Sequence, residues 1–203
     1  MYKKVSEGIT LILVLATFLI VPSSVVQLSH AQPNQDMAAV LEVHNQERAA
    51  IKAPLLSWSD SLAADAQSWA NHLSTLGIVC GEQGCKLPDG TPVSSKLHGA
   101  ANENMAFGLV YPADFPRTPP ADYAQLWAKE KAKYDAGQHS GSGIGHYTAM
   151  VWKSTKELGC GFVAGALPND AGHGGGADIL VCRYFPGGNS PNQASRAENL
   201  PNY

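Results

Sequence analysis

Several features that would assign this chain to a common functional class are missing from it. Lys and Arg number 14 against 17 Asp and Glu, and charged residues make up 15% of the chain, so a basic surface for nucleic acid is not expected. No Gly-x-Ser-x-Gly motif accompanies the HGGG at 173–176, which excludes the nucleophile elbow of α/β-hydrolases. The four cysteines contain no Cys-x-x-Cys pair, so they do not form a structural zinc site.

A long apolar run does occur, at the N-terminus. Two lysines precede apolar residues 9–21, and small residues occupy the −3 and −1 places of a cleavage site after Ala31. This is the three-part layout of a secretory signal peptide, so residues 1–31 are expected to be removed. The alternative is an uncleaved anchor, since apolar residues continue with interruptions to Val26 and a spanning helix needs about 20. Residues 32–203 are expected to be secreted, with no membrane span after cleavage.

The remainder has the length and the apolar content of one folded domain. Hydrophobic residues make up 44% of the chain, which is enough for a proper core. Export makes disulfides possible for Cys80, Cys85, Cys160 and Cys182. Four cysteines allow three pairings, and their spacing alone leaves the choice open.

Helical patterns dominate the first half of the chain. Apolar residues recur at helical spacing in segments 34–51, 60–76 and 120–137, and each segment has capping residues or a proline at its start. Between the second and third segments, residues 77–117 are expected to be mostly loop. One turn of helix is predicted within it, near residues 103–107.

The period changes in the second half. HYTAMVW (146–152), LGCGFVAG (158–165) and DILVCRYF (178–185) are short, rich in β-branched and aromatic residues and bounded by glycine, which predicts strands. The tail from Gly187 is expected to be irregular. Helices on a small, mostly antiparallel sheet predict an α+β fold, an α/β/α sandwich.

Glu130 stands in an apolar stripe. On the third predicted helix, Tyr123, Leu126, Trp127 and Tyr134 share its face. A buried carboxylate there needs a partner, because an isolated buried charge costs several kcal/mol. The alternative is a small rotation of the helix that brings Glu130 to solvent.

Three more ionisable residues are candidates for the same cleft. His98 and Glu103 are five apart, which is wrong for one helix face but suits a loop that directs both side chains inward. His146 is predicted at the mouth of a strand, on a face with Thr148 and Met150. The candidate set is therefore two histidines and two carboxylates, namely His98, Glu103, Glu130 and His146.

Several stretches together resemble one protein family. GHYTAMVWKSTKELGCG and ILVCRYFPGGN resemble the two signature motifs of the CAP superfamily, which includes cysteine-rich secretory proteins, insect venom antigens and plant pathogenesis-related proteins. VHNQERAAIKAPLLSWSDSLAADAQSWA, HGAANENMAFG and LWAKE are similar to further family segments. They follow the family order over residues 36–190, so the resemblance covers one CAP-like domain within residues 32–203.

The resemblance implies a fold and a site. The fold is an α/β/α sandwich with helices on both faces of a small sheet, and the site is a central cleft with the tetrad His98, Glu103, Glu130 and His146. It implies zinc binding at this tetrad, where the histidines would be ligands and the carboxylates would orient them. It also implies binding of a sterol or fatty acid in an apolar groove. Segment 109–120, with its prolines and aromatic residues, is a candidate wall of such a groove, and a surface loop is the simpler interpretation.

We therefore expect a secreted, non-catalytic module that binds a metal and a lipid. A metal-assisted hydrolase is the first alternative, because a metal-bound water is a nucleophile near pH 7. The second is a structural or interaction domain in which the tetrad is a buried polar network. Likeness of fold alone is not evidence of turnover.

The resemblance also implies how the cysteines pair. In plant relatives, the cysteine of the GCG strand pairs with that of the VCRY strand, which here implies Cys160 with Cys182. Cys80 lies where relatives have a cysteine whose partner follows GCG, and this chain has FVAGA there. For Cys80, the resemblance then implies Cys85 as partner.

Four other residues within these motifs bear on the site. Asn102 stands where relatives usually have glycine, and Ala149 stands where they have glutamine, which removes a polar group near the cleft. Asn tolerates unusual backbone angles, so the first departure is expected to be harmless. His44 and Arg48 match family positions with packing and hydrogen-bonding roles, so a structural role is expected for both.

Overall fold

The computed structural model describes residues 33–81, 83–93, 97–108, 117–168 and 176–202. The predicted signal peptide, residues 1–31, lies outside the described residues, as does most of segment 109–120. Within the described ranges, every helix is too short or too polar to cross a membrane.

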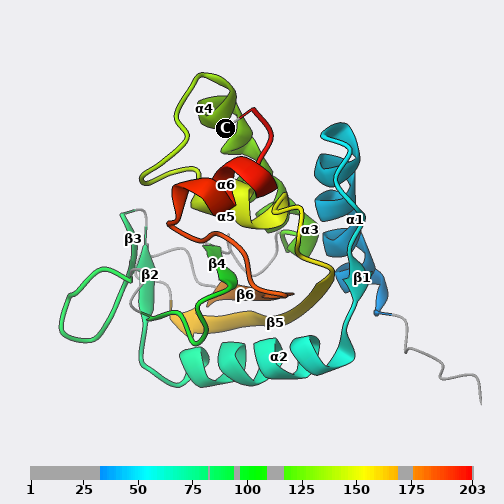
Figure 1. The fold of residues 1–203 in the computed structure, drawn as a ribbon. Coiled ribbons are helices and arrows are strands. Elements are labelled where there is room, and N and C mark those ends of the chain that lie inside the picture. The colour runs from blue at the N-terminus through cyan, green and yellow to red at the C-terminus, as the bar shows by residue number, and fades with distance from the viewer. Residues whose placement is uncertain (1–32, 82, 94–96, 109–116, 169–175, 203) are drawn as a thin grey trace, which may run out of the picture.

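A four-stranded sheet forms the centre of the molecule (Figure 1). Its strands are β1 (Ser57–Trp58), β4 (Glu103–Gly108), β5 (Glu157–Pro168) and β6 (Gly176–Phe185). They lie in the order β1-β5-β6-β4, with β1 parallel to β5 and the other neighbours antiparallel. A separate two-stranded ribbon consists of β2 (Val79–Gly81) and β3 (Gly84–Lys86).

Helices cover both faces of this sheet. They are α1 (Gln35–Ala50), α2 (Asp60–Ser74), α3 (Pro120–Lys129), α4 (Lys131–Asp135), α5 (Gly145–Met150) and α6 (Gln193–Asn199). In Figure 1, α2 runs along one face of the sheet, and the other helices lie on the opposite side. The predicted α/β/α sandwich with a mostly antiparallel sheet is confirmed.

Side chains along β6 alternate between two apolar cores. Leu180, Cys182 and Tyr184 face the core shared with α1, α3 and α5, whereas Ile179 and Val181 face the core shared with α2. None of the five is more than 4% exposed. Because successive side chains of a strand point to opposite faces, a central strand between two helical layers is apolar on both sides.

The GCG motif of β5 follows the same alternation. A Cβ atom at Gly159 would lie 2.2 Å from the backbone nitrogen of Ala63, and one at Gly161 would lie 2.3 Å from the backbone of Gln67. The two glycines therefore let α2 pack directly on the strand. Cys160 points to the other face and forms the disulfide with Cys182.

The first two predicted helices are confirmed. The Asn34 side chain caps α1 by accepting a hydrogen bond of 3.0 Å from the N–H of Met37, and α2 ends ahead of Gly77, which has a positive φ. The helix predicted over 120–137 is observed as α3 and α4, which meet at Glu130.

Two of the three predicted strands are confirmed, because residues 158–165 and 178–185 lie in the antiparallel pair β5 and β6. The strand predicted over 146–152 is wrong, since this segment forms helix α5. Residues 147–150 are all buried, so no alternation distinguishes a strand from a helix. In addition, the first N–H groups of α5 donate to Glu130, which favours the helix.

Predictions for two less periodic segments are also wrong. The helical turn near 103–107 is strand β4, because this short apolar segment completes an antiparallel ladder with β6. The tail from Gly187 is not wholly irregular: Asn192 caps α6 by accepting from the N–H of Ser195, and Leu200 after it is buried. The predicted loop over 77–117 contains the β2–β3 ribbon as well.

Candidate functional site

The four residues of the predicted tetrad line one cleft of about 420 Å³. His98 precedes β4, Glu103 begins β4, Glu130 ends α3, and His146 lies in the first turn of α5. The remaining wall consists mainly of small residues, namely Ala100, Ala101, Gly141, Ser142, Gly143 and Gly145, with Asn104 and Asn189. The lining thus comes from segments 98–104 and 141–146 together with Glu130 and Asn189.

Glu130 and His146 form the first half of the tetrad. Glu130 Oε1 lies 2.7 Å from His146 Nδ1, and its Oε2 accepts from the backbone N–H groups of His146 (2.9 Å) and Tyr147 (3.1 Å). The Glu130 side chain is 16% exposed, so the helix does not turn it into solvent. Leu126, which was predicted on the same apolar face, is instead 55% exposed.

These partners also change the acidity of Glu130. Burial alone would raise its pKa. The hydrogen bond from His146, the charge of that imidazole and the two backbone N–H groups more than offset burial and hold the pKa of Glu130 below its usual range. Glu130 is therefore an anion, and an anion only accepts hydrogen bonds, so His146 donates from Nδ1.

Two further contacts hold His146. The indole of Trp127 stacks on its ring, with the centroids 5.8 Å apart and the planes 13° from parallel. The backbone carbonyl of His146 accepts a hydrogen bond of 3.1 Å from Asn104 Nδ2. The His146 side chain is still 39% exposed, so its ring reaches the cleft.

Glu103 and His98 form the second half. The Glu103 side chain is fully buried, and its Oε1 accepts from the backbone N–H of Gly99 (3.1 Å) and lies 3.2 Å from His98 Nδ1. Its Oε2 accepts from Arg183 Nε at 2.9 Å. In this half, a guanidinium shares the carboxylate with the imidazole.

His44 and Arg48 have the predicted structural role, because both are fully buried. Burial is the main cause that lowers the pKa of His44 to about 4 and that of Arg48 to about 10. The Arg48 guanidinium donates to five backbone carbonyls, those of Pro54, Met150, Trp152, Lys153 and Thr155. It thereby ties α1 to the segment between α5 and β5.

Comparison with known proteins identifies the family of this chain. The model of the CAP family, described as the cysteine-rich secretory protein family, matches residues 41–184. The chain belongs to the CAP family.

Individual CAP relatives align over most of the chain. Golgi-associated plant pathogenesis-related protein 1 of Homo sapiens is 32% identical, over 79% of this chain and 89% of its own length. Pathogenesis-related protein 1C of Nicotiana tabacum is 32% identical, over 88% of both chains. The solved structure of NaASP2 with Zn2+ superimposes with a TM-score of 0.50 at 19% identity, over 80% of this chain and 85% of that one, which supports the fold.

In this CAP domain, the donor set of the cleft suits a metal only through its histidines. No group of three or more His, Cys, Asp or Glu side chains that could hold a metal ion is found in the described part of the chain. Each imidazole has Nδ1 next to its own carboxylate, so Nε2 of His98 and His146 are the ring nitrogens that could bind a metal. Zinc sites with a bound water ordinarily have three protein ligands, so at two imidazoles water would have to fill the remaining positions.

Sequence patterns do not reveal three residues that shape this CAP cleft, namely Asn104, Arg183 and Tyr184. Strand register would have identified Arg183, because β4 pairs with β6 so that Glu103 lies opposite Arg183. Asn104 lies opposite Cys182, two positions before Tyr184. The helical turn predicted over the start of β4 hides this pairing.

The two departures from the CAP motifs leave the tetrad in place. Asn102 is not among the residues with positive φ, so this position does not require glycine here. Ala149 lines a cavity of about 20 Å³ beside Glu103 and Tyr184, in the space next to the cleft. The described cleft therefore has no side-chain amide at position 149.

Proposed function

We propose that this protein is an exported CAP domain that binds one zinc ion through Nε2 of His98 and His146 and does not catalyse a reaction. The observation that carries the proposal is that Nδ1 of each histidine lies within hydrogen-bond distance of a carboxylate of its own, and both histidines line one cleft. A carboxylate on Nδ1 fixes the tautomer, orients the ring and makes Nε2 a better ligand. The description of the structural neighbour NaASP2 includes Zn2+, which is in line with this choice of metal.

Export is supported by the signal-like N-terminus and by the cysteines. The structure contains the two disulfides, Cys80–Cys85 and Cys160–Cys182, and no free cysteine among the described residues. Disulfides persist in oxidising compartments such as the secretory route and the cell exterior.

The carboxylates favour binding over hydrolysis. A general base needs an oxygen within hydrogen-bond reach of the metal-bound water. Both oxygens of Glu103 and both oxygens of Glu130 already accept hydrogen bonds from the protein. The alternative of a metal-assisted hydrolase requires one of these oxygens to accept the proton of the water with a remaining lone pair. It predicts turnover of a peptide and ester library that is lost on chelation and in Glu130→Gln.

Zinc binding is tested directly on the untagged, purified protein. Metal analysis and titration calorimetry should show about one zinc per chain in the wild type. The double variant His98→Ala, His146→Ala should lose it, whereas the control His72→Ala, on the exposed surface of α2, should keep it. Equal binding by the wild type and the double variant would refute the proposal.

Lipid binding stays a prediction that rests on the family resemblance. Residues 109–116, the greater part of the segment expected to wall an apolar groove, lie outside the described residues. The tetrad cleft is not such a groove, because two imidazoles, two carboxylates and two amides line it. Retention of a radiolabelled sterol and of a fatty acid panel would test the prediction, and the absence of saturable retention would exclude it.

A further inference from the structure

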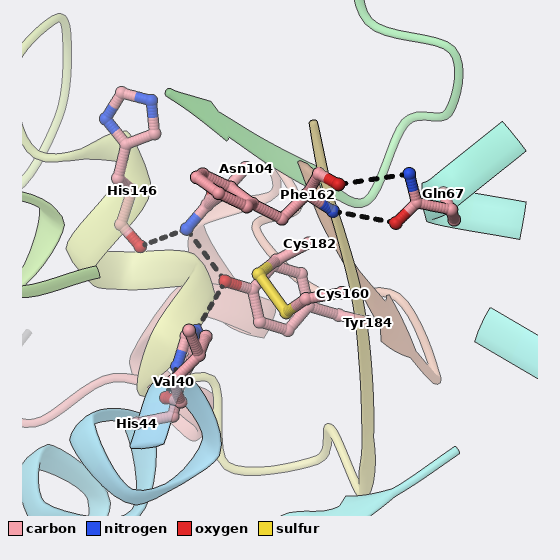
Figure 2. The surroundings of a disulfide bond; sticks show 9 residues. All are labelled: Val40, His44, Gln67, Asn104, His146, Cys160, Phe162, Cys182 and Tyr184. Atoms are coloured by element: carbon pink, nitrogen blue, oxygen red, sulfur yellow. Dashed lines mark hydrogen bonds between the residues drawn. A yellow bond between two sulfur atoms is a disulfide. The ribbon is translucent and has the colours of Figure 1, made fainter. Parts of the chain in front are cut away.

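A buried chain of hydrogen bonds runs from α1 to the backbone of His146 (Figure 2). His44 Nε2 lies 2.9 Å from the hydroxyl of Tyr184, and Asn104 Nδ2 lies 2.8 Å from the same hydroxyl and 3.1 Å from the carbonyl oxygen of His146. His44, Tyr184 and Asn104 are 0%, 4% and 2% exposed. Solvent therefore does not compete for the two bonds among these three side chains.

The direction of each bond in the chain follows from the one before it. The carbonyl of His146 only accepts, so the amide nitrogen of Asn104 must face it. That same nitrogen donates to the Tyr184 oxygen, which leaves the Tyr184 hydroxyl to donate to His44 Nε2. His44 then carries its proton on Nδ1 and donates to the carbonyl of Val40 at 2.8 Å. One arrangement of protons satisfies every group.

The hydrogen-bond chain ends at the backbone of His146, and the ring of His146 is held by a different element. Glu130 binds the N–H and the ring Nδ1 of His146, whereas Asn104 binds its carbonyl. The first contacts come from α3 and the last comes from β4, so two separate elements fix the backbone and the ring. Helix α5 has only six residues, and its N-cap residue Ile144 makes no capping hydrogen bond, so contacts from other elements, such as those of Glu130, decide where it lies.

We propose that Asn104 is a positioning residue for the metal ligand His146, and that Tyr184 and His44 hold Asn104 in the orientation this requires. The inference rests on the proposed zinc site for its functional meaning. The hydrogen-bond chain itself is a feature of the metal-free protein. Failure of one is therefore distinguishable from failure of the other.

The test compares zinc affinity in three variants. Asn104→Leu removes both donated bonds at similar volume and should weaken zinc binding about 10- to 100-fold, the range for partners that orient a ligand. Tyr184→Phe leaves the Asn104–His146 bond and should weaken it less than Asn104→Leu. The matched control is Gln67→Met on the opposite face of the sheet, which breaks two bonds to the backbone of Phe162 (Figure 2) and should leave zinc affinity unchanged.

NMR of the metal-free protein supplies a readout that simple loss of stability would not move. The wild type should show His44 as the Nδ1–H tautomer, and Asn104→Leu should shift the amide and ring signals of His146, whereas Gln67→Met should not. The proposal is overturned if His44 is the Nε2–H tautomer, or if Asn104→Leu and Gln67→Met have equal effects on zinc affinity. If the wild type does not bind zinc, the proposed function fails, and unmoved His146 signals in Asn104→Leu would refute the positioning role separately.

Discussion

Each half of the tetrad consists of one histidine and one glutamate, but the two halves are held in different ways. In one, His146 Nδ1 lies 2.7 Å from a carboxylate whose other contacts are neutral backbone N–H groups. In the other, His98 Nδ1 lies 3.2 Å from a carboxylate that also binds the Arg183 cation. The Arg183 cation partly offsets the negative charge of Glu103. Glu103 therefore polarises the imidazole of His98 less than Glu130 polarises that of His146.

The difference indicates that the two histidines are unequal ligands. His146 has a short bond to its carboxylate, a stacked indole and a fixed backbone carbonyl. Among the described residues, His98 contacts the carboxylate of Glu103, and it lies in a loop before β4. We expect His146 to provide most of the affinity of the proposed zinc site.

The largest expected effect is on the pH dependence of stability. Only the His146 half of the tetrad is connected, through Asn104 and Tyr184, to a buried neutral histidine, His44. Burial lowers the pKa of His44 to about 4 from 6.5. The unfolded chain thus takes up a proton as the pH falls below 6.5, while the folded protein resists until about 4. The free energy of unfolding should therefore fall by about 3 kcal/mol across this window, and this contribution is fully present only above 6.5.

Urea denaturation at several pH values between 4 and 7 measures this dependence. His44→Gln should flatten it, and His72→Ala should follow the wild type. An unchanged slope in His44→Gln would show that the acid sensitivity has another source.

The next largest effect should separate the two carboxylates. In Glu130→Gln, the amide oxygen can still accept from the two backbone N–H groups of α5. The amide NH2 group then faces His146 Nδ1. The proton then moves to Nε2, which cannot bind a metal, so zinc affinity should fall about 10- to 100-fold. Glu103→Gln should weaken zinc binding less but cost more stability, about 1–3 kcal/mol, because Arg183 loses a charged partner.

Calorimetry with zinc and urea denaturation of both variants would measure the two quantities. A greater loss of zinc affinity in Glu103→Gln than in Glu130→Gln would reverse the ranking of the two halves.

The smallest expected effect is spectroscopic. Trp127 stacks on His146, so its emission should change when zinc binds that ring. Trp127→Phe should abolish most of the response while zinc affinity changes little. Trp58→Phe, whose indole donates to Asp60 outside the cleft, should retain the response, and a full response in Trp127→Phe would argue against metal contact at His146.

Local patterns were sufficient for much of this fold. Capping residues and apolar periodicity locate α1 and α2, and the two glycine-bounded segments locate β5 and β6. The family motifs, rather than physical periodicity, bring His98 and Glu103 together with Glu130 and His146. Periodicity did suggest a partner for Glu130, although it placed the exposed Leu126 on the buried face.

The rest depends on contacts between residues that are far apart in sequence. Arg183 reaches Glu103, and Tyr184 reaches Asn104, across 80 positions in each case. Only the register of β4 on β6 creates these contacts. The sequence of a short apolar segment such as β4 does not determine which strand it pairs with. For the same reason, the buried segment that forms α5 was predicted as a strand.

Arg48 gives the molecule a cation of its own. Five carbonyl oxygens surround its guanidinium, much as carbonyl oxygens surround a metal ion in a coordination cage. The segment after α5 is thus organised by a positive charge that is covalently part of the chain and is always present. The proposed zinc site lies at the other end of α5, where His146 is in the first turn. It would depend on a cation taken up from solution. Chelation is therefore expected to affect the first turn of α5, which contains His146. The end of α5 at Met150, which Arg48 contacts, should be unchanged.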